Sequence, residues 1–237
     1  MFWPVLTLAA ARDRGMLRAK VIEIRDTVFR YPGGDFTLRI DSLDVDSAEQ
    51  VALIGSSGCG KTTLAHLIAG IHCAEAGTIR VAGHDVHTMG DRERRDFRIS
   101  NIGFIFQEFE LLDYLRVSEN ILLPYQINSS LRLTDEAKDR AERLATTVGL
   151  TDKLNKFPRQ LSQGERQRLA ICRALVTEPK IVIADEPTGN LDPTTSQSVM
   201  RLIHDSVTSH EAALLMITHD HGLLEPFDRV IDMKQFH

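Results

Sequence analysis

Apolar and polar residues alternate near the beginning of the chain, between Lys20 and Asp46. Apolar side chains occupy every second position in Ile22–Ile24 and again in Phe36–Ile40, and the run Pro32–Gly34 separates the two stretches. Alternation with a period of two is typical of strands with one buried face, and proline with glycine between such strands is typical of a turn. The pattern therefore predicts an antiparallel hairpin.

Short, mainly apolar runs follow the hairpin and are typical of strands buried on both faces. Helical crossovers fit between them, and after the first run the apolar residues Leu64, Leu67, Ile68 and Ile71 have helical spacing. These observations predict an α/β fold with a mostly parallel sheet covered by helices and an N-terminal antiparallel β-subdomain. The five runs are Val51–Ile54, Ile102–Phe106, Ile181–Ala184, Leu214–Thr218 and Val230–Met233.

Buried-strand runs are absent between about residues 108 and 161, which indicates a helical subdomain inserted in the sheet domain. Within it, Thr134–Val148 is predicted to be a helix, with Asp135 and Glu136 in its first turn and Gly149 at its end. The expected organisation is a flexible N-terminal extension, residues 1–19, followed by a single domain, residues 20–237. A short membrane-surface contact is the alternative for the apolar start of the extension.

Composition excludes several classes of protein. The 237 residues are 43% hydrophobic and carry a net charge of −5, so a disordered chain is excluded and a dedicated nucleic-acid binder is not expected. Arginines at positions 92–98 alternate with acidic residues, which favours a solvated helix face over a nucleic-acid site. No run approaches the roughly 18 apolar residues that cross a bilayer, so a protein acting at a membrane would need another chain to span it.

A glycine-rich loop joins the first buried run to the following helix. Its sequence fits the pattern G-x-x-x-x-G-K-[ST], in which backbone N–H groups and the helix N-terminus surround phosphate groups. Lys61 is suited to reach the outer phosphates, and the Thr62 hydroxyl is suited to bind Mg²⁺. For Cys59 a small side chain at a variable loop position is favoured over redox control. The predicted phosphate-binding residues are Gly55, Ser56, Ser57, Gly58, Cys59, Gly60, Lys61, Thr62 and Thr63.

Polar residues follow three of the predicted strands, where ligands gather in doubly wound sheets. Asp185 and Glu186 end one strand, and we expect Asp185 to hold Mg²⁺ and Glu186 to accept a proton from attacking water. His219 follows a second strand and is suited to contact the terminal phosphate. Gln107 follows a third, and its amide oxygen could bind Mg²⁺ or the attacking water. A helix N-terminal acid pair is the simpler alternative for Asp185 and Glu186.

The segment Leu161–Arg168 opens another predicted helix. Ser162 and Glu165 have the S-x-x-E spacing of a capping box, so this segment could be only a well-capped helix. Leu161–Glu165 also resembles the LSGGQ signature of ABC-transporter ATPases, with Gln163 and Glu165 departing from it. Together with the phosphate loop, Gln107, Asp185-Glu186, Asn190-Leu191-Asp192 and His219, in that family's order, the resemblance covers Lys20 to about Met233.

The resemblance implies a P-loop ATPase that binds and hydrolyses ATP with Mg²⁺. It implies that Tyr31 stacks on adenine, although Tyr31 could instead cover the core of the hairpin. It further implies that two copies enclose two ATP molecules, so that each site receives Ser162 and Gly164 from the partner chain. Glu165 would repel phosphate, but capping would turn it back toward its own helix, where it is favoured by ~0.3–1 kcal/mol.

The segment Phe109–Pro124 is similar to the corresponding region of the lipoprotein-releasing and macrolide-exporter branch of that family. The resemblance implies a homodimer that drives integral membrane permease subunits from the cytoplasmic face of the membrane, with the exposed apolar residues of this segment forming a docking groove. A packed subdomain helix is the alternative for the segment. For the whole chain, the alternatives are a cell-division ABC ATPase, a soluble non-transport ABC ATPase and a regulatory protein with negligible hydrolysis.

Overall fold

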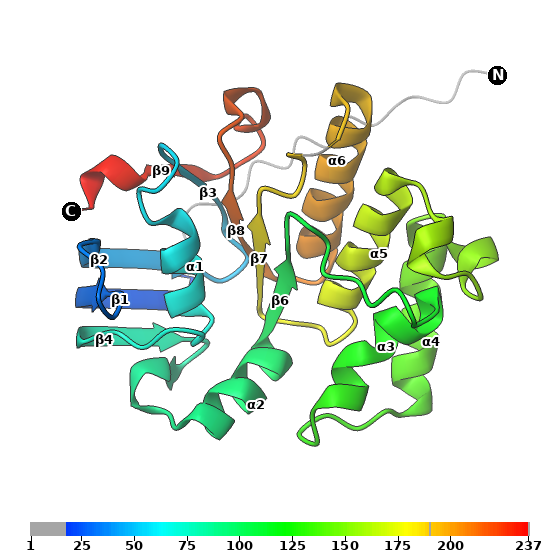
Figure 1. Cartoon of the computed structure of the whole chain (residues 1–237), viewed down its shortest axis with the longest axis horizontal. Helices are drawn as coiled ribbons and strands as arrows, with labels where there is room; N and C mark the ends of the chain where they lie inside the picture. The colour runs from blue at the N-terminus through cyan, green and yellow to red at the C-terminus, as the bar shows by residue number, and fades with distance from the viewer. Residues whose placement is uncertain (1–17, 190, 237) are drawn as a thin grey trace.

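The computed structural model describes residues 18–189 and 191–236, and its strands form two sheets (Figure 1). The N-terminal extension lies outside the described residues except for its last two positions, and Asn190 also lies outside them. The first sheet is antiparallel, with strand order β2-β1-β4-β5, and the second is parallel, with order β6-β7-β8-β3-β9. This architecture confirms the predicted α/β fold with an N-terminal antiparallel part.

The antiparallel sheet begins with the predicted hairpin. Strands β1 (Lys20–Arg30) and β2 (Thr37–Asp46) pair in a register that places Ile24 opposite Leu43. Strand β4 (Ala76–Val81) pairs with the other edge of β1, and the short β5 (His84–Asp85) follows. The sequence pattern missed β4, because its first residues are small or polar and show no alternation.

All five predicted buried runs form the parallel sheet, so these predictions are confirmed. Its central strands β7 and β8 are almost wholly buried, because helices cover one face and a helix together with the antiparallel sheet covers the other. The strands are β3 (Gln50–Ile54), β6 (Ile102–Ile105), β7 (Ile181–Asp185), β8 (Ala213–Ile217) and β9 (Arg229–Asp232). Parallel strands place their carboxyl ends at one edge of the sheet, so the polar residues that follow them are brought together there.

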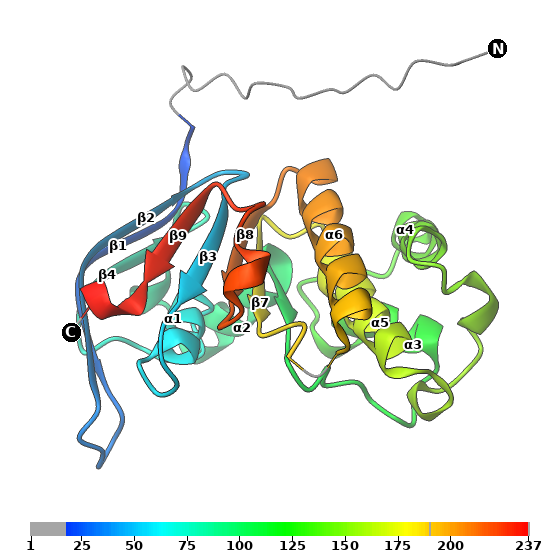
Figure 2. The ribbon, with the colours of Figure 1, turned by 90° about the horizontal axis from the view of Figure 1, so that it is seen from above.

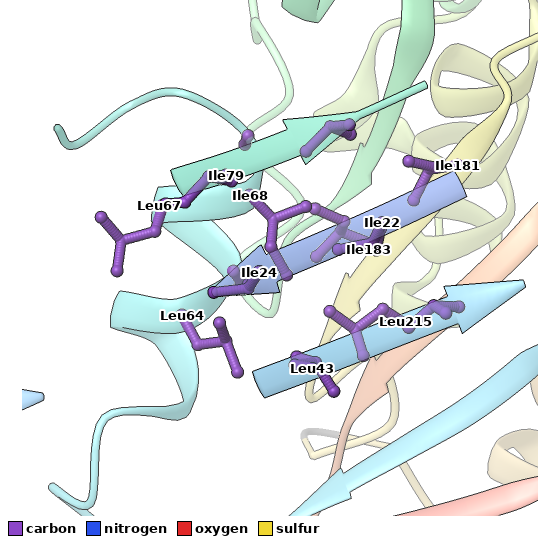
Figure 3. Packing of buried hydrophobic residues seen from close by; sticks show 14 of the residues in the cluster. Ile22, Ile24, Leu43, Leu64, Leu67, Ile68, Ile79, Ile181, Ile183 and Leu215 are labelled. Carbon is purple, nitrogen blue, oxygen red and sulfur yellow. The ribbon is translucent and has the colours of Figure 1, made fainter. Parts of the chain in front are cut away.

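Helix α1 (Lys61–Ile68) lies between the two sheets (Figure 2). Figure 3 shows its apolar residues Leu64, Leu67 and Ile68 packed among isoleucines and leucines of both sheets, and all three are buried. The prediction that Ile71 continues this buried stripe is wrong. The helix ends before Gly70, whose φ of 63° turns the chain, and Ile71 is 40% exposed.

The remaining helices surround the parallel sheet, and α3 and α4 lie with α5 at the end remote from the antiparallel sheet (Figure 1). The predicted helix of residues 134–148 is confirmed as α4, and its N-cap Thr134 accepts a hydrogen bond from the amide of Ala137. No helix in the described part of the chain is long and apolar enough to cross a membrane. The α-helices are α2 (Asp91–Asn101), α3 (Val117–Ile127), α4 (Asp135–Thr147), α5 (Gln163–Leu175) and α6 (Pro193–Ser209), with short 3-10 turns at Val86–Thr88, Thr151–Lys153, Pro158–Gln160, His221–Leu223 and Met233–Gln235.

The arginines of α2 confirm the predicted solvated face only in part. Arg95 pairs with Asp91 at 3.0 Å, and both side chains are largely exposed. Arg98 instead turns inward and donates a hydrogen bond to the carbonyl of Ala69 at 3.3 Å, and burial lowers its pKa.

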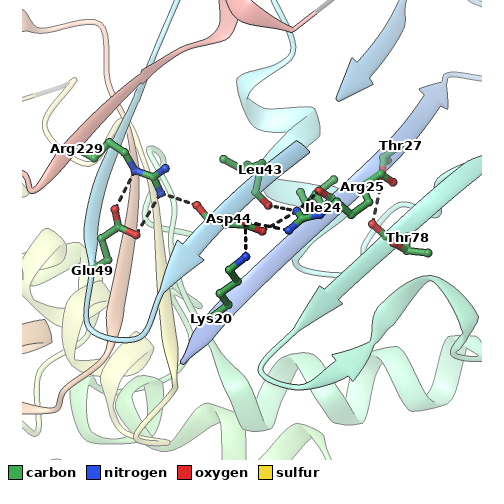
Figure 4. Close-up of polar contacts among 9 residues, drawn as sticks. All are labelled: Lys20, Ile24, Arg25, Thr27, Leu43, Asp44, Glu49, Thr78 and Arg229. Atoms are coloured by element: carbon green, nitrogen blue, oxygen red, sulfur yellow. Dashed lines mark hydrogen bonds and ion pairs between the residues drawn. The ribbon is translucent and has the colours of Figure 1, made fainter. Parts of the chain in front are cut away.

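A polar network joins the two sheets at the ends of β1, β2 and β9 (Figure 4). Arg229 donates to both carboxylate oxygens of Glu49, at 2.9 and 3.2 Å, and to the carbonyl oxygen of Asp44 at 2.5 Å. The Asp44 carboxylate in turn accepts hydrogen bonds from Arg25 and Lys20, of which the bond from Arg25 contributes most to holding its pKa below the ordinary value. The network fixes the sheets relative to each other at the side remote from α1.

A buried histidine on α6 gives a pH prediction. His204 contacts the side chain of Gln50, and burial lowers its pKa against the opposing effect of Asp205 and Asp228. Between the lowered pKa and the ordinary value of 6.5, the unfolded chain binds more protons than the folded chain, so stability falls as the pH falls through this window.

We expect a His204→Asn variant to lose less stability than the wild type when the pH falls from 7.5 to 5.5, as measured by urea unfolding. His221→Asn, at an exposed position, is the control and should behave like the wild type. Equal pH dependence in the wild type and His204→Asn would contradict the assignment.

Candidate functional site

A cleft of about 630 Å³ opens where the glycine-rich loop meets the carboxyl ends of β6, β7 and β8. We call it the central cleft. It brings together side chains that are distant in sequence, including all the predicted residues that follow strands. It is lined by Tyr31, Phe36, Gly55, Ser57, Gly58, Gly60, Lys61, Thr62, Thr63, Gln107, Asp185, Glu186 and His219.

The glycine-rich loop has the backbone of an anion-binding loop. Gly60 caps α1 with φ 101°, and a Cβ at this position would lie 2.9 Å from Phe36 Cζ, so both conformation and space require glycine. No side chain among the described residues caps α1, so its first amides have no competing side-chain acceptor. The Lys61 ammonium is largely buried and donates to the carbonyl oxygens of Gly55 and Ser56, both at 2.9 Å. The loop therefore combines backbone amides at the N-terminus of α1 with a lysine ammonium that two loop carbonyl oxygens hold in place.

Two predicted residues lie beside the cleft without lining it. Ser56 contributes its carbonyl oxygen to Lys61. Cys59 packs against the apolar core, and its Sγ would be 2.7 Å from a Cβ at Gly55. A small side chain at position 59 therefore serves packing beneath the loop.

A hydrogen bond joins the loop to the end of β7. The Thr62 hydroxyl donates to Asp185 Oδ2 at 3.0 Å. Burial raises the pKa of Asp185, with Glu186 adding to the rise and Thr62 opposing it. A hydroxyl and a partly buried carboxylate facing each other form an oxygen donor set of the kind that Mg²⁺ prefers, so these residues fit that ion.

Glu186 occupies a strained backbone position at the floor of the cleft. Its φ is 45°, a left-handed conformation that costs a non-glycine residue on the order of 1–3 kcal/mol. Its amide donates to the carbonyl of Ile217 at 3.0 Å, and its carbonyl accepts from the amide of Gly189 at 3.1 Å. Its carboxylate Oε1 lies 3.2 Å from His219 Nδ1. The backbone of Glu186 is thus held from both neighbouring segments, and its carboxylate lies beside His219.

Aromatic side chains form one wall of the cleft. The Tyr31 hydroxyl lies 3.0 Å from Thr63 Oγ1, and its ring is in edge contact with Phe29 while remaining 37% exposed. Tyr31 therefore covers part of the hairpin core and also lines the cleft, and its stacking on adenine stays a prediction. Phe36 lines the same wall. The sequence pattern missed its role, because its place in the alternation indicated only a core position.

Gln107 reaches the cleft from a turn after β6. The amide of Phe109 donates to the carbonyl of Phe106 at 3.2 Å and closes the turn around Gln107. A Cβ at Gly189 would lie 3.4 Å from the Gln107 amide nitrogen and 3.7 Å from Glu186 Oε2, so both side chains lie beside Gly189. Amide and carboxylate thus face one space.

Ser162 and Gly164 do not line the central cleft of their own chain. Ser162 is the N-cap of α5, where its Oγ accepts from the amide of Glu165 at 3.3 Å and its amide donates to Glu165 Oε2 at 2.7 Å. The predicted capping box is confirmed. The bond from the Ser162 amide lowers the pKa of Glu165, whose carboxylate is directed to its own helix terminus.

A second cavity, of about 370 Å³, lies between α2, β6, α3 and α5. We call it the lateral groove. Only the Glu110, Leu123 and Pro124 part of the predicted docking segment lines it, because Val117 and Ile121 are buried inside the helical layer. Its apolar lining includes Ile71, Phe104, Phe106, Leu123, Pro124 and Ile127, and its charged lining consists of Arg95, Arg98, Glu110 and Arg173.

Comparisons of this chain with a family model and with known proteins point to the same family. A family model described as ABC transporter matches residues 38–189. The lipoprotein-releasing system ATP-binding protein LolD of Chromohalobacter salexigens is 42% identical over 231 residues, covering 97% of this chain and 95% of that protein. The macrolide export ATP-binding/permease protein MacB of Rhodopirellula baltica is 42% identical over 207 residues, but this chain spans only 30% of its length.

Solved structures with the same fold include two ATP-binding cassettes. The cassette MJ0796, solved as a dimer in a post-hydrolysis state bound to ADP and Pi, matches with a TM-score of 0.76 and 28% identity, over 89% of this chain and 93% of that one. CbiO1 of Clostridium perfringens, part of an ABC transporter complex, matches with a TM-score of 0.80 and 25% identity, over 91% and 85% of the two chains.

Proposed function

This chain belongs to the ABC transporter family, and from that premise we propose that it is the ATPase subunit of a membrane complex that exports substrates or releases lipoproteins. One observation carries the proposal. A single cleft brings together the phosphate loop, Gln107, Asp185, Glu186 and His219. The ring of Tyr31 lines the same cleft, where a nucleobase could stack on it. The curated relatives above are named for lipoprotein release and macrolide export, which favours a transport partner over the cell-division, soluble and non-hydrolysing alternatives.

ATP would bind with its phosphates against the glycine-rich loop and its base against Tyr31. The buried Lys61 ammonium would exchange its two loop carbonyls for phosphate oxygens, which are stronger acceptors because they are charged. Thr62, Gln107 and Asp185 are the residues that would hold Mg²⁺. The ion would neutralise charge on the outer phosphates.

Hydrolysis requires a proton acceptor beside the terminal phosphate, and we assign this role to Glu186. Water oxygen attacks the γ-phosphorus, the bond to the β-phosphate oxygen breaks, ADP departs with the electron pair, and the water proton passes to Glu186. His219, 3.2 Å from the Glu186 carboxylate, would fix its orientation and contact the transferred phosphoryl group. The strained backbone at Glu186 supports this role, because such strain clusters at active sites.

The site of one chain is incomplete without a second copy. Ser162 and Gly164 lie outside their own cleft, and the capping box holds the Glu165 carboxylate on the Ser162 amide. A helix N-terminus of this kind attracts anions. We therefore assign Ser162 and Gly164 to the ATP bound by a partner copy, with Asp192, the N-cap of α6, at the same interface. The solved dimeric cassette supports this arrangement.

The lateral groove is the proposed docking site for the permease. Its exposed apolar side chains, Ile71 at 40% and Ile127 at 66%, are suited to the apolar face of a short helix. Binding a membrane permease would hold the chain at the cytoplasmic face of the membrane. No nucleic-acid partner is proposed.

An Ile127→Glu variant tests this assignment. A carboxylate in place of the apolar Ile127 side chain should remove apolar contact area from the groove and abolish co-purification of the permease from detergent-solubilised membranes. ATP hydrolysis by the isolated subunit should stay within about twofold of wild type, because Ile127 is exposed and does not line the cleft. Leu133→Glu, at a position 40% exposed and outside the groove, is the matched control and should retain the permease. Retention of the permease by Ile127→Glu would refute the docking site.

A further inference from the structure

The segment that follows Gln107 is strained and must be held from outside. Phe109 and Glu110 are consecutive residues with φ of 62° and 49°, and neither is glycine. A left-handed backbone costs each on the order of 1–3 kcal/mol and persists only where the surroundings fix it. The amide of Glu110 bonds locally to the carbonyl of Glu108, at 2.7 Å, and this bond engages neither the carbonyl of Phe109 nor that of Glu110.

Both carbonyls are bonded to one arginine of α5. Arg173 donates through one nitrogen to the carbonyl of Phe109, at 2.5 Å, and through the other to the carbonyl of Glu110. Burial lowers the pKa of Arg173, which indicates a guanidinium withdrawn from water, with its charge directed at backbone dipoles. The planar fork of arginine suits two adjacent acceptors, and charge-assisted bonds are the strong ones.

The bonded segment is the same one that presents Gln107. The turn around Gln107 is closed by the amide of Phe109, and the carbonyl of Phe109 is bonded to Arg173. From this continuity we infer that Arg173 is a positioning residue for Gln107, holding its amide at the magnesium and water side of the central cleft. The inference rests on the proposed role of Gln107 in ATP hydrolysis.

The same contact joins three parts of the molecule. Arg173 lies on α5, the helix whose first turn carries Ser162 and Gly164, and both Arg173 and Glu110 line the lateral groove. A partner seated in the groove would therefore touch the arginine that fixes Gln107. Displacement of α5 would move the Gln107 turn with it.

An Arg173→Met variant of the full-length chain tests the inference. Losing both bonds lets the strained segment relax and misplaces the Gln107 amide, so kcat should fall about ten- to a hundredfold, the scale of a misplaced positioning group, while KM for ATP stays within about twofold. Arg173→Lys keeps the charge and one donor nitrogen and should recover part of the rate. It also replaces the methionine variant if that variant cannot be purified.

A double-variant cycle separates positioning from simple loss of stability. If Arg173 acts through Gln107, adding Arg173→Met to Gln107→Ala should lower kcat no further. Arg140→Met is the matched control, since Arg140 also donates to a backbone carbonyl, that of Val176, but does not line the cleft. It should lower the melting temperature and leave kcat unchanged.

Three results would overturn the inference and leave the proposed function standing. The first is an unchanged kcat in Arg173→Met. The second is a loss of kcat in Arg140→Met as large as that in Arg173→Met. The third is a double variant, Gln107→Ala with Arg173→Met, whose loss of kcat equals the product of the two single losses. A wild-type chain without ATPase activity would instead refute the proposed function itself.

Discussion

A Glu186→Gln variant is expected to bind ATP as tightly as the wild type and to hydrolyse it about 10²–10⁴ times more slowly, the range in which a general base contributes. Glutamine keeps the shape of the side chain and its contact with His219, but it cannot take a proton from water. Phosphate release under single-turnover conditions measures the chemical step, and a fluorescent ATP analogue measures binding.

The matched control for this variant is Glu108→Gln, which changes the carboxylate next to Gln107 in the sequence, a residue that does not line the cleft. It should retain the wild-type rate. Turnover that is unchanged in Glu186→Gln would exclude Glu186 as the base and leave His219 or Asp185 to be tested.

Replacing Lys61 by alanine should have the second large effect, a loss of ATP binding. Charge-assisted hydrogen bonds contribute ~1.5–3 kcal/mol each, which corresponds to a loss of affinity of roughly 10- to 150-fold per bond. Titration calorimetry with ATP and Mg²⁺ measures the change. Lys180→Ala, at an exposed lysine outside the cleft, is the control and should bind normally. Equal affinities for both variants would contradict the assignment of Lys61 to the phosphates.

Local patterns predicted the parts of the molecule whose physical cause lies within a few adjacent residues. The apolar run ending at Ile54 and the glycines after it specify a strand and a phosphate loop together, because both need residue types at fixed positions. The capping box of Ser162 and Glu165 is likewise complete within four residues. Such features need no knowledge of the distant chain.

Features that depend on distant contacts could not be predicted. Strand β4 begins with small and polar residues and is a strand because the edge of β1 offers it hydrogen-bond partners. Phe36 enters the cleft because Gly60 leaves room for its ring. Arg173 acquires its contacts only when α5 packs beside the Gln107 turn. In each case the deciding neighbour lies more than 20 positions away in the sequence.

The central claim is that two copies must meet before ATP is hydrolysed, and sedimentation of Glu186→Gln tests it most directly. The slowed variant should hold ATP long enough for a dimer to accumulate. With saturating ATP its sedimentation should change from one chain to two as concentration rises, and without ATP it should remain a single chain. A variant that binds ATP yet stays a single chain at every concentration, beside a wild type whose specific activity is independent of its own concentration, would contradict the account.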